Sequence, residues 1–250
     1  MRIRFLGTGA SGGTPGRGRS ARLESSALVE HGARVLIDAT RHFAVQSDGL
    51  EDLDAVLLTH GHRDACGGMA ALGAWWSQRA SSPLPVLASP ATIAVVRERS
   101  RRLDCCELVR VRPGQPRRIG SLSVTALTVP HARDRRFPTF AWRIEAGDRV
   151  LVYASDVARL TSALRRFANG ADLLVVDGAM WRRRLHTHLT IDAELPDLCT
   201  WPVRRIRLTQ IGRTAPPHER LRREVASLCA KAAPAYDGLD LRVGEATDPA

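Results

Sequence analysis

Two histidines and an aspartate, His60, His62 and Asp64, have the side-chain types and spacing of metal ligands. They follow an apolar run, residues 55–58, with the length and composition of a buried strand. Alternate residues at the end of a strand point the same way, and Gly61 between the histidines lets the backbone turn tightly. The two imidazoles can therefore converge on one point. The alternative is a pair of ordinary loop histidines.

The segment from Leu57 to Gly68, LLTHGHRDACGG, resembles the signature of the metallo-β-lactamase superfamily. That signature reads Thr-His-x-His-x-Asp-His before a Gly-Gly pair, and its metal ions sit between two packed sheets. Where the family has the third histidine, this chain has Ala65. The resemblance implies an α/β fold, a four-layer αβ/βα sandwich of two mixed β-sheets, over one domain covering residues 1–250.

The resemblance also implies a first metal site held by three histidines. His60 and His62 match the signature, and His131 stands where the family has a histidine at the end of a middle strand. Asp156 matches a bridging aspartate at a later strand end, and Asp38 is expected to support the site from behind. Three imidazoles and a carboxylate leave room for water, as in catalytic zinc sites. Each residue alone could be structural, but their order and strand-end positions favour a site.

The second metal site of the family is incomplete in this chain. Its ligands would be Asp64, the shared Asp156, and histidines at the positions of Ala65 and Gln210. Both second-site histidines are missing while the first site is complete, so we expect one tightly bound zinc ion. The oxygens of Asp64, Asp156 and the Gln210 amide could hold a harder ion such as Mg²⁺ or Mn²⁺ weakly.

His188 resembles a family histidine that binds or protonates a phosphodiester, as in ribonuclease Z and the cyclic ribose phosphodiesterase of phosphonate breakdown. A histidine that supports a metal ligand or caps a helix is the alternative. The resemblance implies a hydrolase for a small phosphodiester or related ester. Asp64 would orient or deprotonate water, and His188 would protonate the leaving oxygen. Two other hypotheses stay open: a weakened or non-catalytic member that binds a ligand or partner, motivated by Ala65 and Gln210, and an RNA-processing, nuclease-like protein.

Composition narrows these hypotheses. The chain has 250 residues, of which 44% are hydrophobic, enough for one large core. Its net charge of +11 comes almost entirely from arginine, since Lys231 is the one lysine, and runs such as 182–184 lack interleaved aromatics. A solvated surface is therefore favoured over a nucleic-acid platform or a phosphate-steering patch. We expect a small-molecule substrate, with a homo-oligomer left open.

Cysteine usage and hydropathy favour a cytoplasmic protein. The five cysteines lack disulfide or metal spacing, and Cys66, although next to the motif, is not expected to be a ligand. No apolar stretch approaches the ~20 residues that span a bilayer. The N-terminus is typical of a strand rather than a signal peptide. We therefore expect no membrane association.

The elements that must position these residues alternate between strands and helices. The glycine-dense loop at 7–16 runs into a strand, so it does not match a dinucleotide-binding loop, which opens a helix. His218 is predicted to start a surface helix. The predicted strands cover residues 2–6, 25–29, 35–38, 55–58, 85–88, 122–129, 139–144, 149–153, 173–177, 205–209 and 235–239. The predicted helices cover residues 69–79, 90–99, 157–167 and 216–231, and a further short helix is predicted directly after Thr190.

Overall fold

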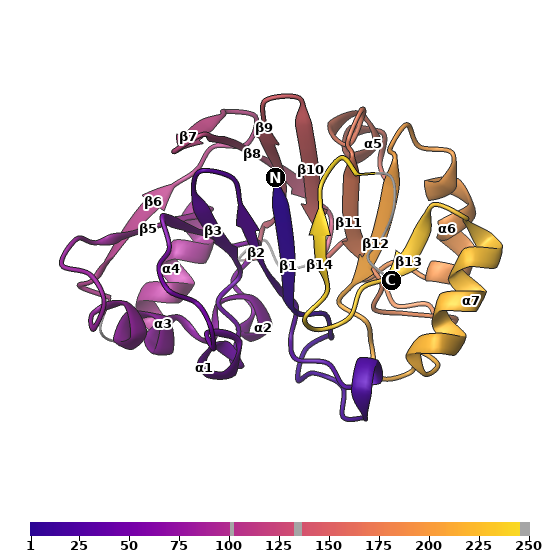
Figure 1. The fold of residues 1–250 in the computed structure, drawn as a ribbon, viewed down its shortest axis with the longest axis horizontal. Coiled ribbons are helices and arrows are strands. Elements are labelled where there is room, and N and C mark those ends of the chain that lie inside the picture. Colours follow the sequence, from indigo (N-terminus) through magenta and orange to yellow (C-terminus); the bar gives the residue numbers. More distant parts are fainter. Residues whose placement is uncertain (101–102, 133–136, 246–250) are drawn as a thin grey trace.

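The computed structural model describes residues 1–100, 103–132 and 137–245. Within them, two seven-stranded sheets pack face to face, with helices on both outer sides (Figure 1). The first sheet contains β1 (Arg2–Gly7), β2 (Ser26–Glu30), β3 (Arg34–Ile37), β4 (Ala55–Leu57), β5 (Leu84–Ala88), β6 (Cys106–Arg110) and β14 (Asp240–Arg242). The second contains β7 (Arg117–Ile119), β8 (Leu122–Val129), β9 (Thr139–Ala146), β10 (Arg149–Ala154), β11 (Leu173–Asp177), β12 (Arg205–Thr209) and β13 (Ala232–Pro234). The helices are η1 (Gly18–Ser20, 3₁₀), α1 (Phe43–Gln46), α2 (Arg63–Cys66), α3 (Met69–Trp76), α4 (Pro90–Arg99), α5 (Ser162–Phe167), α6 (Ile191–Cys199) and α7 (His218–Leu228).

Both sheets are mixed, as the sequence predicts. The first runs β14-β1-β2-β3-β4-β5-β6, and the second runs β13-β12-β11-β10-β9-β8-β7. In the first sheet β14 to β3 pair antiparallel and β3 to β6 pair parallel. In the second, β7 to β10 pair antiparallel and β10 to β13 pair parallel. The four-layer αβ/βα sandwich is therefore confirmed.

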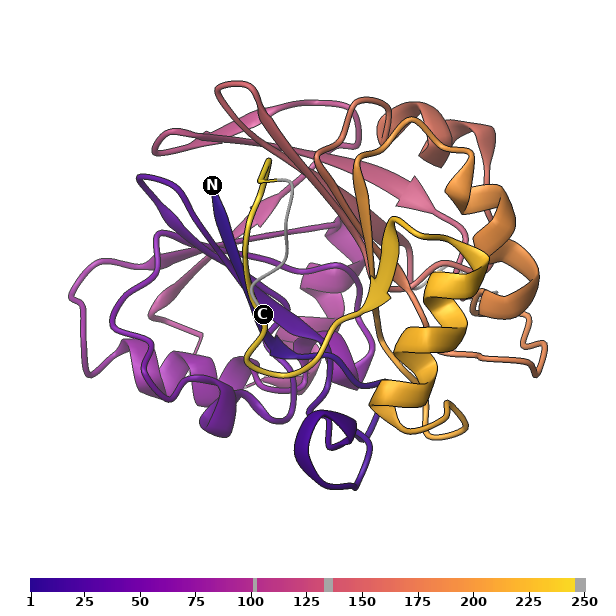
Figure 2. The same cartoon turned by 45° about the vertical axis from the view of Figure 1, so that its right-hand side comes forward.

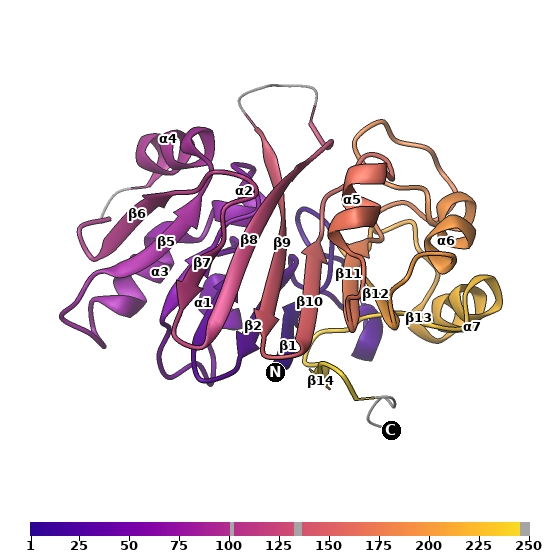
Figure 3. The same cartoon turned by 90° about the horizontal axis from the view of Figure 1, so that it is seen from above.

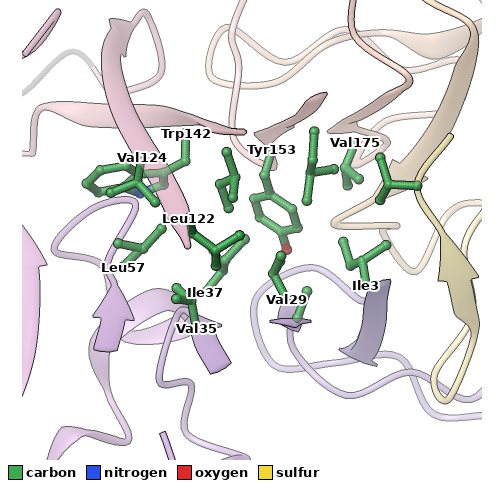
Figure 4. Packing of buried hydrophobic residues seen from close by; sticks show 14 of the residues in the cluster. Ile3, Val29, Val35, Ile37, Leu57, Leu122, Val124, Trp142, Tyr153 and Val175 are labelled. Carbon is green, nitrogen blue, oxygen red and sulfur yellow. The ribbon is translucent and has the colours of Figure 1, made fainter. Parts of the chain in front are cut away.

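The main core lies between the sheets, where alternate strand residues from both sides meet. Trp142 and Tyr153 of the second sheet face Val29 and Ile37 of the first (Figure 4). Each such fully buried side chain contributes roughly 1.5–3 kcal/mol. Two further apolar clusters join the sheets to their helices, α1, α3 and α4 on one side and α5 to α7 on the other (Figures 2 and 3). None of the helices in the described part of the chain has the length and apolar character needed to cross a bilayer.

Three predicted helices are shorter in the structure: α3 ends at Trp76, α7 covers His218–Leu228, and α5 begins at Ser162 rather than Val157. The N–H of Val157 donates instead to Asp177 Oδ2 at 2.9 Å, and Thr161 caps the helix by accepting from the N–H of Leu164. The residues before α5 thus belong to a loop tied to the neighbouring strand.

The predicted closing strand at 235–239 is wrong. These residues connect β13 in the second sheet to β14 in the first, so the strands lie on either side of them. Leu239 donates its N–H to the Tyr236 carbonyl at 3.0 Å, and Gly238, at φ +85°, donates to the Phe5 carbonyl at 2.8 Å. A crossing between two sheets requires this turn, which strand-like composition does not reveal.

His218 starts α7 as predicted but is not on the surface. Its side chain is buried, with its Nδ1 3.1 Å from the Arg22 guanidinium. The imidazole also packs against Tyr236, with 5.4 Å between ring centroids. The prediction failed because the surface of α7 at this point is covered by the long N-terminal loop.

The strand ends bring the predicted chemistry to one edge. Because β10, β11 and β12 are parallel neighbours, Asp156 after β10, Asp177 at the end of β11 and Gln210 after β12 come together. His60 follows β4 of the opposite sheet, and His131 follows β8. Residues up to 150 positions apart therefore share one site.

Candidate metal centre

Three imidazoles converge where the two sheets meet. The rings of His60 and His62 lie 4.7 Å apart, those of His60 and His131 5.1 Å, and those of His62 and His131 5.3 Å, between centroids. One nitrogen of each lies within 4.8 Å of the others. His62 Nδ1 and His131 Nε2 are 3.4 Å apart. The convergence that the His-x-His spacing predicts is present.

The neighbours of His60 leave its inner nitrogen unprotonated. Asp38, held at φ +60°, accepts from the N–H and the hydroxyl of Thr59 at 2.7 and 2.8 Å. The Thr59 oxygen lies 2.9 Å from His60 Nδ1, and because its own proton goes to Asp38, it accepts the Nδ1 proton. The buried Nε2 has no hydrogen-bond partner among the described residues, as expected of a metal ligand. Asp38 thus supports the site through Thr59.

A backbone carbonyl sets the tautomer of His131 in the same way. Nδ1 lies 2.8 Å from the Thr187 oxygen, which can only accept, so Nδ1 carries the proton. The lone pair of Nε2 then faces His62 and Asp156 Oδ1, which is 3.8 Å away. Burial lowers the pKa of His60, and it lowers that of His62 to about 4 with help from the neighbouring imidazoles. Neutral imidazoles are the form that binds metals.

Asp64 and Asp156 lie beside the imidazoles and share one hydrogen-bond donor. Gln210 Nε2 donates to Asp64 Oδ2 at 3.0 Å and to Asp156 Oδ1 at 2.9 Å. Burial and the nearby Asp156 raise the pKa of Asp64. Burial also acts to raise the pKa of Asp156, but the surrounding histidines, His60 first, outweigh it and lower the value to about 2. Asp64 Oδ1 lies 3.9 Å from His60 Nε2.

The Gln210 amide group therefore lies between the carboxylates of Asp64 and Asp156. Ionised carboxylates only accept hydrogen bonds, so the amide must present its NH₂ group to them. The residue is buried at φ +56°, and its N–H donates to Ser25 Oγ at 2.8 Å. The amide therefore presents protons rather than its expected oxygen, whereas Asp64 and Asp156 together with His60 still offer ligand atoms within 4.8 Å of one another. Ala65 is buried and adds no ligand.

His188 forms a dyad with a buried aspartate. Its Nδ1 lies 2.7 Å from Asp177 Oδ2, and Asp177 is also held by the N–H groups of Val157 and Ala179. Burial acts to lower the pKa of His188, but Asp177 outweighs it and raises the value to about 9. The ring packs against that of His131, with 4.9 Å between the centroids. A nitrogen of His188 also lies within 4.8 Å of ligand atoms of His131 and Asp156, so these three residues form a second group that could hold an ion.

The structure thus gathers the residues predicted as ligands or proton carriers and adds others. The predicted ones are His60, His62, Asp64, His131, Asp156 and His188. Asp177 and the Thr187 carbonyl have no counterpart in the sequence analysis, although an aspartate ending the apolar run at 173–176 repeats the pattern that pointed to Asp156. Phe137 packs on His62 with ring centroids 4.4 Å apart. Cys66 is absent from the candidate ligand groups among the described residues and donates its thiol to the His62 carbonyl at 3.3 Å.

Comparisons with known proteins agree with this geometry. Residues 33–209 match the family model described as "Beta-lactamase superfamily domain". The octanoyltransferase of Porphyromonas gingivalis is 26% identical over 98% of this chain and 52% of that protein. Ribonuclease Z of Methanopyrus kandleri is 34% identical over 57% of this chain and 50% of that protein. The chain thus spans about half the length of these curated relatives. A solved diphosphatase of the PhnP family superposes with a TM-score of 0.84 at 25% identity, covering 96% of this chain and 97% of its own.

Proposed function

Because this chain belongs to the β-lactamase superfamily, we propose that it is a metal-dependent hydrolase of a phosphodiester or related ester. The observation that carries the proposal is the convergence of His60, His62 and His131, two of them with an inner Nε2 lone pair fixed by hydrogen bonds on Nδ1. The similarity to a ribonuclease Z and to a diphosphatase supports a phosphorus ester as the substrate class.

The three histidines would hold one ion, with Asp156 beside them. The buried, unpartnered His60 Nε2 fits this role, because an orphaned buried nitrogen is costly without a ligand. Three imidazoles with a carboxylate beside them are a ligand set that suits zinc. When bound, the ion supplies Lewis acidity, which lets water ionise near neutral pH and polarises an ester oxygen.

Two other side chains would move protons. Asp64 has one oxygen tied to Gln210 and the other near His60, so this second oxygen can orient a water and take its proton. Its raised pKa suits a base. His188 has Nδ1 committed to Asp177, which leaves Nε2–H to donate to the ester or to the departing oxygen. A pKa of about 9 keeps this imidazole protonated at neutral pH.

The proposal includes a single tightly bound ion. The Gln210 NH₂ group already bridges Asp64 and Asp156, so a second ion could bind only by displacing it. A neutral amide stabilises two carboxylates less than a divalent cation does, so these two acids keep a higher affinity for protons than they would have in a two-metal site.

The test combines metal analysis with a hydrolysis assay on the full chain. Purified protein should contain one zinc per chain and should hydrolyse bis(p-nitrophenyl) phosphate. His131→Ala should lose the metal and the activity, whereas His31→Ala, at an exposed histidine outside the site, should keep both. Two zinc ions per chain would refute the single-ion proposal. Stoichiometric zinc without hydrolysis of phosphodiesters, thioesters or lactams would favour a non-catalytic binding role.

A further inference from the structure

A pocket of about 340 Å³ lies beside the candidate metal centre and is lined by three arginines. Arg41 comes from the loop after β3, Arg63 from α2 and Arg99 from the end of α4. Cys66 and Val96 also line it. The lining contains no carboxylate among the described residues. We call it the arginine pocket.

The three arginines differ in how their charges are balanced. Arg41 donates its backbone N–H and its guanidinium to Glu24, whose side chain is fully buried. Its charge is therefore matched and its position fixed. Arg63 and Arg99 are exposed, and no carboxylate in the described residues lies within ion-pair distance of either. Two uncompensated guanidinium groups thus border the pocket, where an anion would be attracted.

The pocket is physically connected to the metal centre through the histidine segment. Arg99 Nη1 donates to the carbonyl of Gly61, the residue between His60 and His62, at 3.1 Å. Its guanidinium also lies 5.9 Å from the ring of Phe137, which packs on His62. Arg63 directly follows His62 and starts α2. The arginine pocket therefore borders the chain segment that carries the candidate ligands His60 and His62.

We propose that the arginine pocket binds a second phosphate group of the substrate, so that the substrate is a phosphate ester carrying a further terminal phosphate. This inference rests on the proposed hydrolase function. Guanidinium groups match phosphate oxygens with paired N–H donors, and phosphate carries more charge than a carboxylate. The volume falls within the range of small-ligand pockets, so it admits the phosphate together with part of the group that carries it.

The first experiment measures binding without relying on activity. Inorganic phosphate is titrated by calorimetry into the full chain and into its His131→Ala variant, which lacks the metal site but keeps the pocket. Arg63→Gln and Arg99→Gln should each weaken phosphate binding about tenfold, the loss expected for one charge-assisted contact. Arg97→Gln is the matched control, because Arg97 is an exposed arginine of α4 outside the pocket lining. Arg63→Lys, which keeps the charge, should retain most of the binding.

The second experiment compares two esters that differ by one phosphate. These are thymidine 5′-(p-nitrophenyl phosphate) and the same ester with a 3′-phosphate. The 3′-phosphate should raise kcat/KM at least tenfold in the unmodified chain and in Arg97→Gln, and this preference should fall toward one in Arg63→Gln. Zinc content should stay unchanged in that variant, which separates loss of the pocket from damage to the centre.

The outcomes separate the two proposals. Absence of phosphate binding, or an equal loss in Arg97→Gln and Arg63→Gln, would overturn the arginine pocket even if both esters are hydrolysed. Pocket-dependent phosphate binding without hydrolysis of either ester would instead overturn the hydrolase function and leave an anion-binding protein. Hydrolysis of both esters at equal kcat/KM would show that the second phosphate is not part of the substrate.

Discussion

Replacing Gln210 with alanine should destabilise the metal-free protein and create a place for a second cation. The substitution removes the one donor shared by Asp64 and Asp156, at 3.0 and 2.9 Å, and leaves two buried acids without it. A hydrogen bond to a charged group is worth roughly 1.5–3 kcal/mol. Loss of both gives at least about 3 kcal/mol, which for a chain of 250 residues lowers Tm by roughly 6–12 °C.

Thermal unfolding in the presence of a chelator measures this loss, and added zinc or manganese measures its reversal. A cation in the vacated position should raise the Tm of Gln210→Ala more than that of the unmodified chain, because binding to the native state alone stabilises it. Gln210→Glu is a second probe of similar size. Glutamate places a third carboxylate beside two others. The Gln210→Glu variant should therefore have a lower Tm than Gln210→Ala without metal, and added metal should raise its Tm by more.

Two results would refute this reasoning. A fall in Tm of less than about 3 °C for Gln210→Ala would mean that the amide contributes under about 1 kcal/mol and that the acids are satisfied in another way. Equal stabilisation of all three proteins by metal would mean that displacing the amide opens no second site. In either case Gln210 would not be the substitute for a second cation.

Three further predictions concern the same centre and one distant group. Ala65→His combined with Gln210→His should raise the zinc content from one to two per chain, with a gain in affinity greater than the two single variants predict, and phosphodiesterase assays should show whether turnover rises or falls with it. Asp177→Asn removes the carboxylate that raises the pKa of His188, so the basic limb of the kcat/KM profile should move to lower pH; an unmoved limb would exclude His188 as the acid. Burial lowers the pKa of His218 to about 4 from its ordinary 6.5, so the unfolded chain binds a proton that the folded chain does not, and stability is lost as pH falls from about 6.5 to about 4. His218→Gln should lose less Tm across that interval in unfolding scans from pH 7 to pH 4, and parallel curves would contradict the assignment.

The convergence of the histidines and carboxylates was predictable because these residues follow recognisable strands. The resemblance to the metallo-β-lactamase superfamily pointed to His60, His131 and Asp156, and the apolar runs before them predicted that each lies at the end of a strand. Gln210 was located in the same way, but its function was not. Whether an amide presents oxygen or nitrogen depends on which partners face it, and both partners here belong to other segments of the chain.

Other features depend on contacts that no local pattern carries. Asp177 can be recognised in the sequence as an aspartate at the end of a strand. Its partner His188 lies on a separate loop, and only the fold brings the two side chains together. The arginine pocket is harder still to foresee. The excess of arginine predicts a solvated surface, and composition cannot separate Arg41, which is paired with Glu24, from Arg63 on α2, which is not. The distinction depends on where the carboxylates lie.

The charges around the centre explain why one ion and one protonated histidine suit this site. Four buried carboxylates surround it: Asp38, Asp64, Asp156 and Asp177. Burying unpaired charge is costly, so they need positive partners nearby. A divalent ion at the imidazoles would, with the protonated His188, bring the centre within one charge of neutrality. The raised pKa of Asp64 allows the remaining charge to be neutralised by a proton. A phosphate diester adds one negative charge, and a proton passed from water to Asp64 stays within the site and leaves the total charge unchanged. A second phosphate would overload this balance, and the uncompensated guanidinium groups of the arginine pocket lie where that extra charge would be placed.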